Sequence, residues 1–384
     1  MTDTVNILFS LLQFEIFGSK VPEKAKKGIT DDSLSELFNI AKRHDVAHLI
    51  GDALIKNGLL KEGKIKEAFE QQVYMAVYRY QNLNFQLEKI CKLFEENKIP
   101  FIPLKGAVIR KYYPEPWMRT SCDIDILVKN EDLDKSIALL ENTLKYRCGD
   151  MSAHDVSLFL NDTCHVELHY ELIEDLKSQK ANRVLKRVWD YSKPLSDKSS
   201  RYQMNDEMFY FYHIAHMAKH FEIGGCGIRT FIDLKILQNN NFAGKTELLN
   251  EGGLLKFSEV ATDLCDRWFY NKESNFLVTE MEDFILNGGI YGSTQNLVAA
   301  QQLKRGGKFN YALSKIFLPY DIIKYHYTIL IKRKWLTPFF EVVRWFKLLF
   351  GGGIKRSLRE LRINGSVTEK KHKSLEELFK NLEL

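Results

Sequence analysis

A short apolar segment that carries two aspartates constrains this chain more than any other feature. At the two-residue period of a β-strand, Ile124, Ile126 and Val128 share one face. Asp123 and Asp125 share the opposite face, with Cβ atoms roughly 6–7 Å apart. An ionised carboxylate shielded from water needs a proton, a cation or a metal ion as its partner. The segment therefore predicts a site for a hard divalent cation.

Residues before and after the aspartates strengthen this prediction. Lys105 and Gly106 open a predicted helix upstream, and Glu167 lies downstream on a second predicted strand. The apolar neighbours of Glu167 face the core, so Glu167 points to the other face together with His165 and His169. Three carboxylates converge if the two strands are neighbours in one sheet. The alternative is that these acidic side chains simply face solvent from an edge strand.

The composition is that of an ordinary folded protein. The chain has 384 residues, 45% hydrophobic and 27% charged, which is enough for two or three domains. Its six cysteines show no paired spacing, so we expect reduced packing residues rather than a zinc ribbon or a disulfide framework. No secretory leader is recognisable, and no stretch reaches the roughly 18–20 uncharged apolar residues that cross a bilayer. We therefore expect a cytoplasmic protein without stable membrane insertion.

The spacing of apolar residues divides the chain into four regions. Residues 1–97 show a helical period, and residues 98–200 alternate strands with helices. Residues 201–350 return to the helical period between glycine pairs, and residues 351–384 form a basic, partly mobile tail with a short helix at 374–382. Within the second region we expect strands at 99–103, 122–128, 156–160 and 164–170, and helices at 106–113 and 131–144.

Several motifs together resemble a known enzyme family. They are Leu104-Lys105-Gly106, Tyr113-Pro114, Arg119, Asp123-Ile124-Asp125, His165-Val166-Glu167-Leu168-His169, His216-Met217-Ala218-Lys219-His220 and the stretch 227–234. The chain resembles the nucleotidyltransferase domain of the DNA polymerase β-like superfamily, and more closely a bacterial nucleotidyltransferase family within it. The resemblance implies an α+β fold, with a small mixed-sheet core flanked by N-terminal helices and a larger C-terminal helical domain. One departure is Lys105-Gly106, where the superfamily usually has Gly-Ser or Gly-Gly.

The resemblance also implies a reaction, the transfer of a nucleoside monophosphate with release of pyrophosphate. Asp123 and Asp125 would hold one or two Mg²⁺ ions, and Glu167 would complete the metal site or act as a base. His169 would contact the substrate. ATP is the expected donor because of its abundance. The acceptor is open and includes a small molecule, a peptide or protein, and an RNA.

The triphosphate would be held by three upstream residues. Backbone N–H groups at the helix start of Gly106 would contact phosphate oxygens. Lys105 would add positive charge, and Arg119 would offer a planar fork to two oxygens. Each side chain has a structural alternative. Lys105 could be an exposed lysine at a helix start, and Arg119 could pair with a neighbouring carboxylate.

A histidine-rich helix supplies the opposite wall of the expected cleft. His213, His216 and His220 share one face of this helix, a pattern that can ligate zinc. The intervening Lys219 opposes a cation, so we favour contact of Lys219, His220 and Arg229 with the nucleotide or the acceptor. The structural alternative is a helix pair in which Arg229 bonds the aspartate four residues later.

The last third of the chain is basic. From residue 301 onward there are 18 Lys and Arg against 7 Asp and Glu. A second function class follows from this charge, a non-catalytic nucleotide- or nucleic-acid-binding module with the same fold. Residues 332–350 combine basic and bulky apolar side chains. Such a helix could lie on a membrane surface or pack on the preceding helices.

Overall fold

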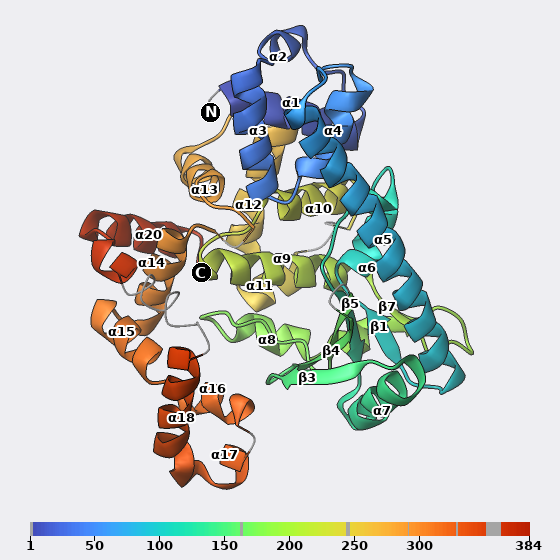
Figure 1. Cartoon of the computed structure of the whole chain (residues 1–384), viewed down its shortest axis with the longest axis vertical. Helices are drawn as coiled ribbons and strands as arrows, with labels where there is room; N and C mark the ends of the chain where they lie inside the picture. Colours follow the sequence, from blue (N-terminus) through green and yellow to red (C-terminus); the bar gives the residue numbers. More distant parts are fainter. Residues whose placement is uncertain (1–2, 162–163, 243–245, 291, 328, 351–361) are drawn as a thin grey trace.

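The chain folds into an α+β structure in which helices surround one mixed β-sheet (Figure 1). The computed structural model describes residues 3–161, 164–242, 246–290, 292–327, 329–350 and 362–384. In Figure 1 the N-terminal helices lie at the top, the sheet lies at the lower right, and the C-terminal helices lie at the left. The predicted fold class is confirmed.

The chain before the sheet is helical. Its helices are α1 (Asp3–Phe17), α2 (Glu23–Lys27), α3 (Asp31–Arg43), α4 (Ala47–Lys56) and α5 (Lys64–Glu96). The start of α3 is fixed by a reciprocal cap, because Thr30 Oγ1 accepts from the Ser33 N–H and Ser33 Oγ accepts from the Thr30 N–H. The long α5 buries Ile90 and Phe94 against the sheet. The helical period predicted for residues 1–97 is therefore confirmed over the part of this range that the structure describes, from residue 3 onward.

One five-stranded sheet forms the centre of the α/β region. Its strands are β1 (Phe101–Pro103), β2 (Ile124–Val128), β3 (Arg147–Met151), β4 (Asp155–Asn161) and β5 (Cys164–His169). Their order is β1-β2-β5-β4-β3, with β2 and β5 parallel and the other neighbours antiparallel. The expected strands are confirmed with shifted ends. Our sequence analysis missed β3, because this exposed edge strand shows no alternation of apolar and polar residues.

The two faces of the sheet have different partners. Ile124, Ile126 and Val128 lie in a hydrophobic cluster with side chains of α5 and α7 (Leu133–Leu144), as the two-residue period predicts. Leu127 belongs to the larger cluster on the other side, which includes the C-terminal helices. Asp125 shares that second face. The sheet is thus covered on both sides, and the acidic residues point toward the helical half of the molecule.

Helices dominate the remainder of the described chain. They are α6 (Gly106–Ile109), α8 (Lys180–Leu185), α9 (Asp206–Ile223), α10 (Ile228–Asn239), α11 (Glu247–Gly252), α12 (Leu255–Tyr270), α13 (Phe276–Leu286), α14 (Thr294–Arg305), α15 (Lys308–Ile316), α16 (Tyr320–His326), α17 (Ile329–Lys332), α18 (Thr337–Phe350) and α20 (Glu369–Asn381). Single 3-10 turns occur at Arg110–Tyr112, Pro116–Met118, Asn130–Asp132, Val188–Tyr191 and Lys334–Leu336. A hairpin of β6 (Ser192–Pro194) and β7 (Tyr202–Met204) precedes α9 and was not predicted. Among the described helices, none has the length and apolar content needed to cross a bilayer.

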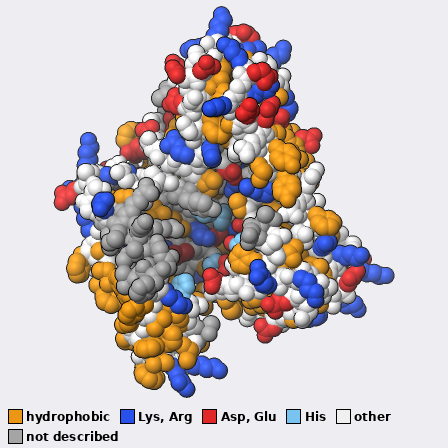
Figure 2. All heavy atoms as spheres, in the orientation of Figure 1, with side chains coloured by type: hydrophobic (Ala, Val, Ile, Leu, Met, Phe, Trp, Pro, Cys, Tyr) orange, Lys and Arg blue, Asp and Glu red, His pale blue; other side chains and the backbone are white. Residues whose placement is uncertain are grey.

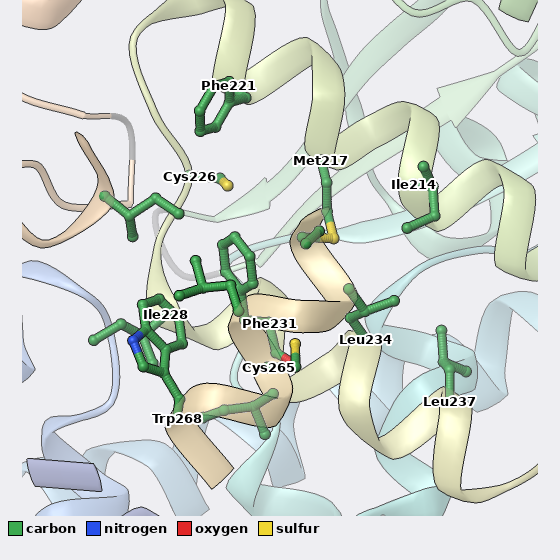
Figure 3. Close-up of a cluster of buried hydrophobic side chains, with 14 of the residues drawn as sticks. Ile214, Met217, Phe221, Cys226, Ile228, Phe231, Leu234, Leu237, Cys265 and Trp268 are labelled. Carbon is green, nitrogen blue, oxygen red and sulfur yellow. The ribbon is translucent and has the colours of Figure 1, made fainter. Parts of the chain in front are cut away.

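The packing of α9, α10 and α12 fixes which face of α9 meets the sheet. Met217 of α9, Phe231 of α10 and Trp268 of α12 meet in one buried cluster (Figure 3). Gly224 ends α9 with a φ of +153°, and an added Cβ would lie 2.7 Å from Leu297 Cα. Only glycine fits there. The opposite face of α9 is left to line the space above the acidic strands.

The end of the chain forms a longer helix than we expected. α20 covers 13 residues, whereas the sequence predicted a helix at 374–382. Leu375 and Leu378 are buried, and α20 contacts α13 and α14. These leucines lie three residues apart on one face of the helix, which explains how a strongly charged segment can pack against the body of the molecule.

Candidate functional site

The two acidic strands are direct neighbours in the sheet. The register of β2 and β5 sets Asp125 opposite Glu167, and Asp123 immediately precedes β2. Possible ligand atoms form two groups, with Asp123, His165 and Glu167 in one and Asp125, Glu167 and His169 in the other. Within each group the atoms lie within 4.8 Å of one another. The structure thus brings together the three carboxylates that the sequence singled out.

Asp125 is held by two positively polarised groups. Lys105 Nζ lies 2.8 Å from Asp125 Oδ1, and His169 Nε2 lies 3.1 Å from the same oxygen. Burial alone would raise the pKa of Asp125, but the charge of Lys105 and the bond from His169 hold it well below its usual range. Asp125 in turn outweighs burial at Lys105 and raises that pKa well above its usual value. Lys105 is therefore the counter-charge of Asp125 in this structure.

Glu167 and Asp123 are less well compensated. Burial and the like charge of Asp125 raise the pKa of the Glu167 carboxyl to about 8. The same two causes raise the pKa of Asp123. Carboxylates crowded in this way repel one another, and a bound divalent cation would remove the repulsion. The electrostatics of the cluster are those of an acidic site that gains from a cation.

The donor atoms in the cluster fit a divalent metal ion. His165 Nε2 is buried without a hydrogen-bond partner among the described residues, and its ring stacks on Phe159 at 4.6 Å. A buried nitrogen without a hydrogen-bond partner is unfavourable, and a cation bound beside the two carboxylates would supply that partner. Carboxylate oxygens with a nearby imidazole suit Mg²⁺ or Mn²⁺. The residues present are therefore compatible with the metal that the sequence led us to expect.

A cavity of about 250 Å³ lies between the carboxylates and α9. The predicted site residues that line it are Lys105, Gly106, Arg119, Asp123, Asp125, Glu167, Lys219, His220 and Arg229. His169 is not among the lining residues and instead holds Asp125 from within the sheet. In Figure 2 acidic, basic and histidine side chains meet in a hollow at the centre of the face shown. Residues from five separate parts of the sequence thus face one space.

Our sequence analysis missed Glu174, a buried acid that organises the α9 wall. Its carboxylate lies 2.9 Å from His216 Nδ1 and 2.9 Å from Lys219 Nζ. His220 Nε2 in turn lies 3.1 Å from His216 Nε2. Burial alone would raise the pKa of Glu174, but the contacts with His216 and Lys219 outweigh burial and hold this pKa far below the usual range. Nothing in the acidic stretch around Glu174 marks this residue out from its neighbours.

We expect Glu174→Gln to destabilise the protein by about 2 kcal/mol at neutral pH, because it removes a buried charge from two partners. The lowered pKa means that the ionised carboxylate stabilises the fold above the unfolded-state pKa and that this contribution is lost as the pH falls. The difference from wild type should therefore be large at pH 7 and shrink below about pH 4.5. Urea unfolding at both pH values measures it. Glu171→Gln, an exposed change in the same segment, serves as the control and should have little effect at either pH.

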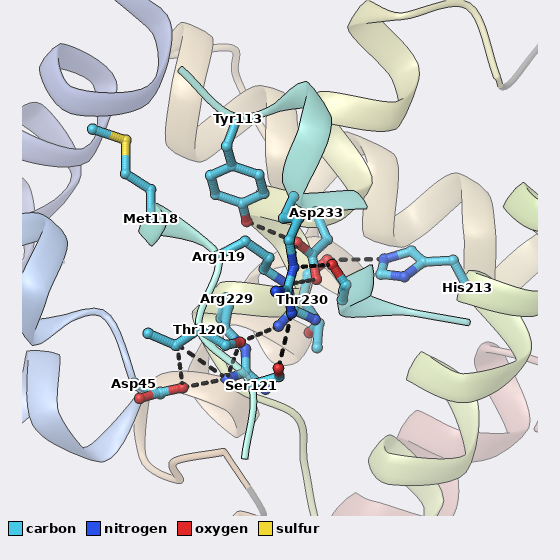
Figure 4. A network of polar contacts seen from close by, with 12 residues as sticks. Asp45, Tyr113, Met118, Arg119, Thr120, Ser121, His213, Arg229, Thr230 and Asp233 are labelled. Carbon is cyan, nitrogen blue, oxygen red and sulfur yellow. Dashed lines mark hydrogen bonds and ion pairs between the residues drawn. The ribbon is translucent and has the colours of Figure 1, made fainter. Parts of the chain in front are cut away.

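Arg119 forms the structural pair that the sequence left open as an alternative. Its Nε lies 2.8 Å from both carboxylate oxygens of Asp233, which has no exposed surface. Tyr113 also donates to Asp233, at 2.7 Å (Figure 4). Arg119 Nη1 donates to the carbonyl of Thr120. The guanidinium is therefore committed to joining the segment before β2 to α10, although it still borders the cavity.

The pairing of Arg229 with Asp233, which the sequence offered as the structural alternative, does not form. Arg229 instead forms an ion pair with Asp45, which follows α3, and Thr120 donates to the same carboxylate at 2.9 Å (Figure 4). Helical spacing suggested the local pair, but Asp233 is taken by Arg119, which is distant in sequence. Arg229 thereby connects the N-terminal helices, the loop before β2 and α10 at the rim of the cavity.

The helix that begins at Gly106 is shorter than predicted. α6 covers only four residues and continues as a 3-10 turn to Tyr112. So short a helix has a weak macrodipole, which shifts the expected phosphate contacts toward side chains. Lys105 precedes it with a φ of +42°, an uncommon conformation for a residue with a side chain. This conformation accompanies the bond from Lys105 Nζ to Asp125.

The zinc alternative for the histidine helix gains no support. His213 Nε2 bonds the carbonyl of Thr230 at 3.1 Å, and His216 bonds Glu174. Burial and the neighbouring His216 lower the pKa of His220 to about 3, so its imidazole is neutral. Within the described residues, the groupings of possible metal ligands include none of these three histidines. The helix supplies hydrogen-bonding groups to the cavity wall.

Comparison with known proteins identifies the family of the chain. A family model described as an uncharacterised nucleotidyltransferase matches residues 30–270. The chain belongs to this nucleotidyltransferase family. Comparisons with curated proteins and with solved structures gave no match. The matched residues include the whole sheet, α9, α10 and every side chain of the acidic cluster, whereas α13 to α20 lie beyond them. The predicted resemblance is thus confirmed.

Proposed function

We propose that the protein catalyses Mg²⁺-dependent transfer of AMP from ATP to an acceptor oxygen, with release of pyrophosphate. An acceptor oxygen forms a bond to the α-phosphorus, and the bond from that phosphorus to the bridging oxygen of pyrophosphate breaks. The observation that carries the proposal is the pairing of Asp125 with Glu167 across parallel strands, with Asp123 beside them, in a member of a nucleotidyltransferase family.

The acidic cluster and its neighbours Lys105 and His169 have different roles in this proposal. Asp123, Asp125 and Glu167 would hold the ion, which would supply charge neutralisation for the phosphates and polarisation of the reacting oxygens. Glu167 belongs to both ligand groups, so we assign it as the shared ligand. His169 orients Asp125 by its bond to Oδ1. Lys105, which pairs with Asp125 in this structure, would lie beside the phosphates and add positive charge there.

The opposite wall recognises the substrates. Lys219 and Arg229 bring positive charge to the cavity, and His220 brings a neutral imidazole. Arg119 does not contact substrate in this proposal. Its guanidinium is held by Asp233, and it positions the residues before β2. We assign adenine as the base of the nucleotide donor only because ATP is abundant. The acceptor class stays a prediction that includes small molecules, peptides or proteins, and RNA.

Nucleotide binding is the first test, because it needs no knowledge of the acceptor. Calorimetric titration with a non-hydrolysable ATP analogue should show an affinity at least about tenfold higher with Mg²⁺ than with EDTA, since triphosphates reach such sites with their metal. Labelled ATP added to a cell extract with the protein should then label an acceptor and release pyrophosphate. An affinity for the ATP analogue that does not change with Mg²⁺ but falls steeply with salt would instead support the alternative of a non-catalytic binding module.

A further inference from the structure

The helices after the family-matched region present an unusual amount of apolar surface to solvent. Half of the large hydrophobic side chains that are exposed in the described chain lie between residues 309 and 346. Trp335 is 75% exposed and Phe309 is 77% exposed. In Figure 2 this surface is the continuous hydrophobic area at the lower left, over α15 to α18. Concentrated exposure of this kind marks an interaction surface.

Two charged residues of helix α18, Glu341 and Arg344, face inward. Glu341 is 6% exposed, and its carboxylate accepts from the Leu318 N–H at 2.7 Å. Arg344 donates to Glu341 at 2.9 Å and also to the carbonyl of Ile316. These bonds hold the polar face of α18 against the segment between α15 and α16. An ordinary surface helix has the reverse arrangement, with its apolar face inward.

The apolar face of α18 therefore points to solvent. Phe339, Val342 and Phe346 follow one another at helical spacing and are 61%, 53% and 57% exposed. Trp335 extends the same series by one turn in the preceding 3-10 segment. Side chains that cost free energy in water are thus aligned along one line of the surface, which is the geometry of a helix that lies on an apolar medium.

Basic side chains flank this apolar line. Lys332, Arg333 and Lys334 are exposed immediately before Trp335, and Lys347 is exposed beside Phe346. Between residues 308 and 347 the sequence has eight basic residues and two acidic residues, one of which is Glu341. Because Glu341 is buried with Arg344, the outward charge of the region is strongly positive.

We propose that the surface of α17 and α18 binds an anionic phospholipid membrane. Phe339, Val342 and Phe346 would enter the boundary between headgroups and acyl chains, where bulky apolar and aromatic side chains are favoured. Lys332, Arg333 and Lys334 would contact the negatively charged headgroups. The combination of aromatic residues with an excess of positive charge favours lipid over a protein partner. The attachment is peripheral, in keeping with the absence of a spanning helix among those described.

Vesicle sedimentation of the full chain tests this proposal. We expect binding to vesicles that contain phosphatidylcholine and phosphatidylglycerol, and weak binding to phosphatidylcholine alone. Replacing Lys332, Arg333 and Lys334 by Gln should lower binding to the anionic vesicles by about fivefold per residue, as one basic residue near an anionic surface contributes about that factor. The double variant Phe339→Ser and Phe346→Ser should lower binding to the same vesicles by about tenfold or more.

A matched control separates this surface from general exposure. Phe276→Ser removes a phenylalanine that is 76% exposed on α13, outside the surface, and should leave vesicle binding unchanged. All the substituted side chains are exposed, so thermal unfolding should be unaffected. The proposal is overturned if anionic vesicles do not bind the protein, or if Phe276→Ser weakens binding as much as the double variant. It is equally overturned if the double variant abolishes a protein dimer without changing vesicle binding.

Discussion

Asp125→Asn is expected to lower nucleotidyl transfer by about 10³-fold or more, because a ligand lost from a catalytic metal site costs several kcal/mol of transition-state stabilisation. Asparagine keeps the shape of the side chain but removes the charge that faces Lys105 and His169. Mg²⁺-dependent binding of the ATP analogue should disappear with it. Pyrophosphate release and calorimetric titration measure the two effects on the same preparation.

Loss of the fold must be separated from loss of the site. Asp125→Asn leaves the Lys105 ammonium without its counter-charge, so this variant should also unfold at lower urea. Adding Lys105→Met removes the unpaired charge and should recover most of the stability but none of the activity. Asp134→Asn, on the exposed side of α7, is the control that changes neither. Activity of Asp125→Asn above a tenth of wild type would contradict the site.

The acidic cluster was predictable because strands obey a simple geometric rule. The period of two placed Asp125 and Glu167 on the polar face of each strand, and the apolar neighbours identified the other face as core. The remaining step was the pairing of two strands that lie about 40 residues apart. The sequence predicted a convergence of the carboxylates only if these two strands were neighbours. The parallel pairing of β2 with β5 shows that they are.

The connections on the other side of the cavity were not predictable in the same way. Helical spacing offered Asp233 as the local partner of Arg229, but the structure gives Asp233 to Arg119 and Arg229 to Asp45. A local pattern describes only neighbours on one helix, whereas these partners are more than 100 residues apart. Glu174 illustrates the same limit, since its role depends on α9 folding back over the residues after β5.

The apolar face of α18 shows a different kind of limit. Its residues read as an amphipathic helix, and burial against the preceding helices is the common outcome for such a pattern. What the sequence could not reveal is which face turns inward, because that depends on the bonds of Glu341 and Arg344 to the segment before α16. Those two polar residues face inward and leave Phe339, Val342 and Phe346 in solvent.

The buried pair of Arg119 with Asp233 leads to the largest expected change in stability. Asp233→Asn should lower the free energy of unfolding by about 4 kcal/mol, because it leaves a guanidinium buried without its counter-charge. Arg119 is 7% exposed and Asp233 is fully buried, so water cannot replace the lost partner. Tyr113 also loses an ionised acceptor. Urea unfolding followed by circular dichroism measures the change, with the exposed Asp263→Asn of α12 as control.

A double-mutant cycle shows whether the pair is structural or also contacts substrate. Arg119→Met combined with Asp233→Asn removes both charges and should cost less than the sum of the single changes. If Arg119 only positions the segment before β2, loss of its own charge should not weaken nucleotide binding further. The double variant should then bind the ATP analogue at least as tightly as the single Asp233→Asn variant. A double variant that regains stability but binds the ATP analogue far more weakly than Asp233→Asn would instead assign Arg119 to the phosphates, because only the loss of its own charge then distinguishes the two proteins.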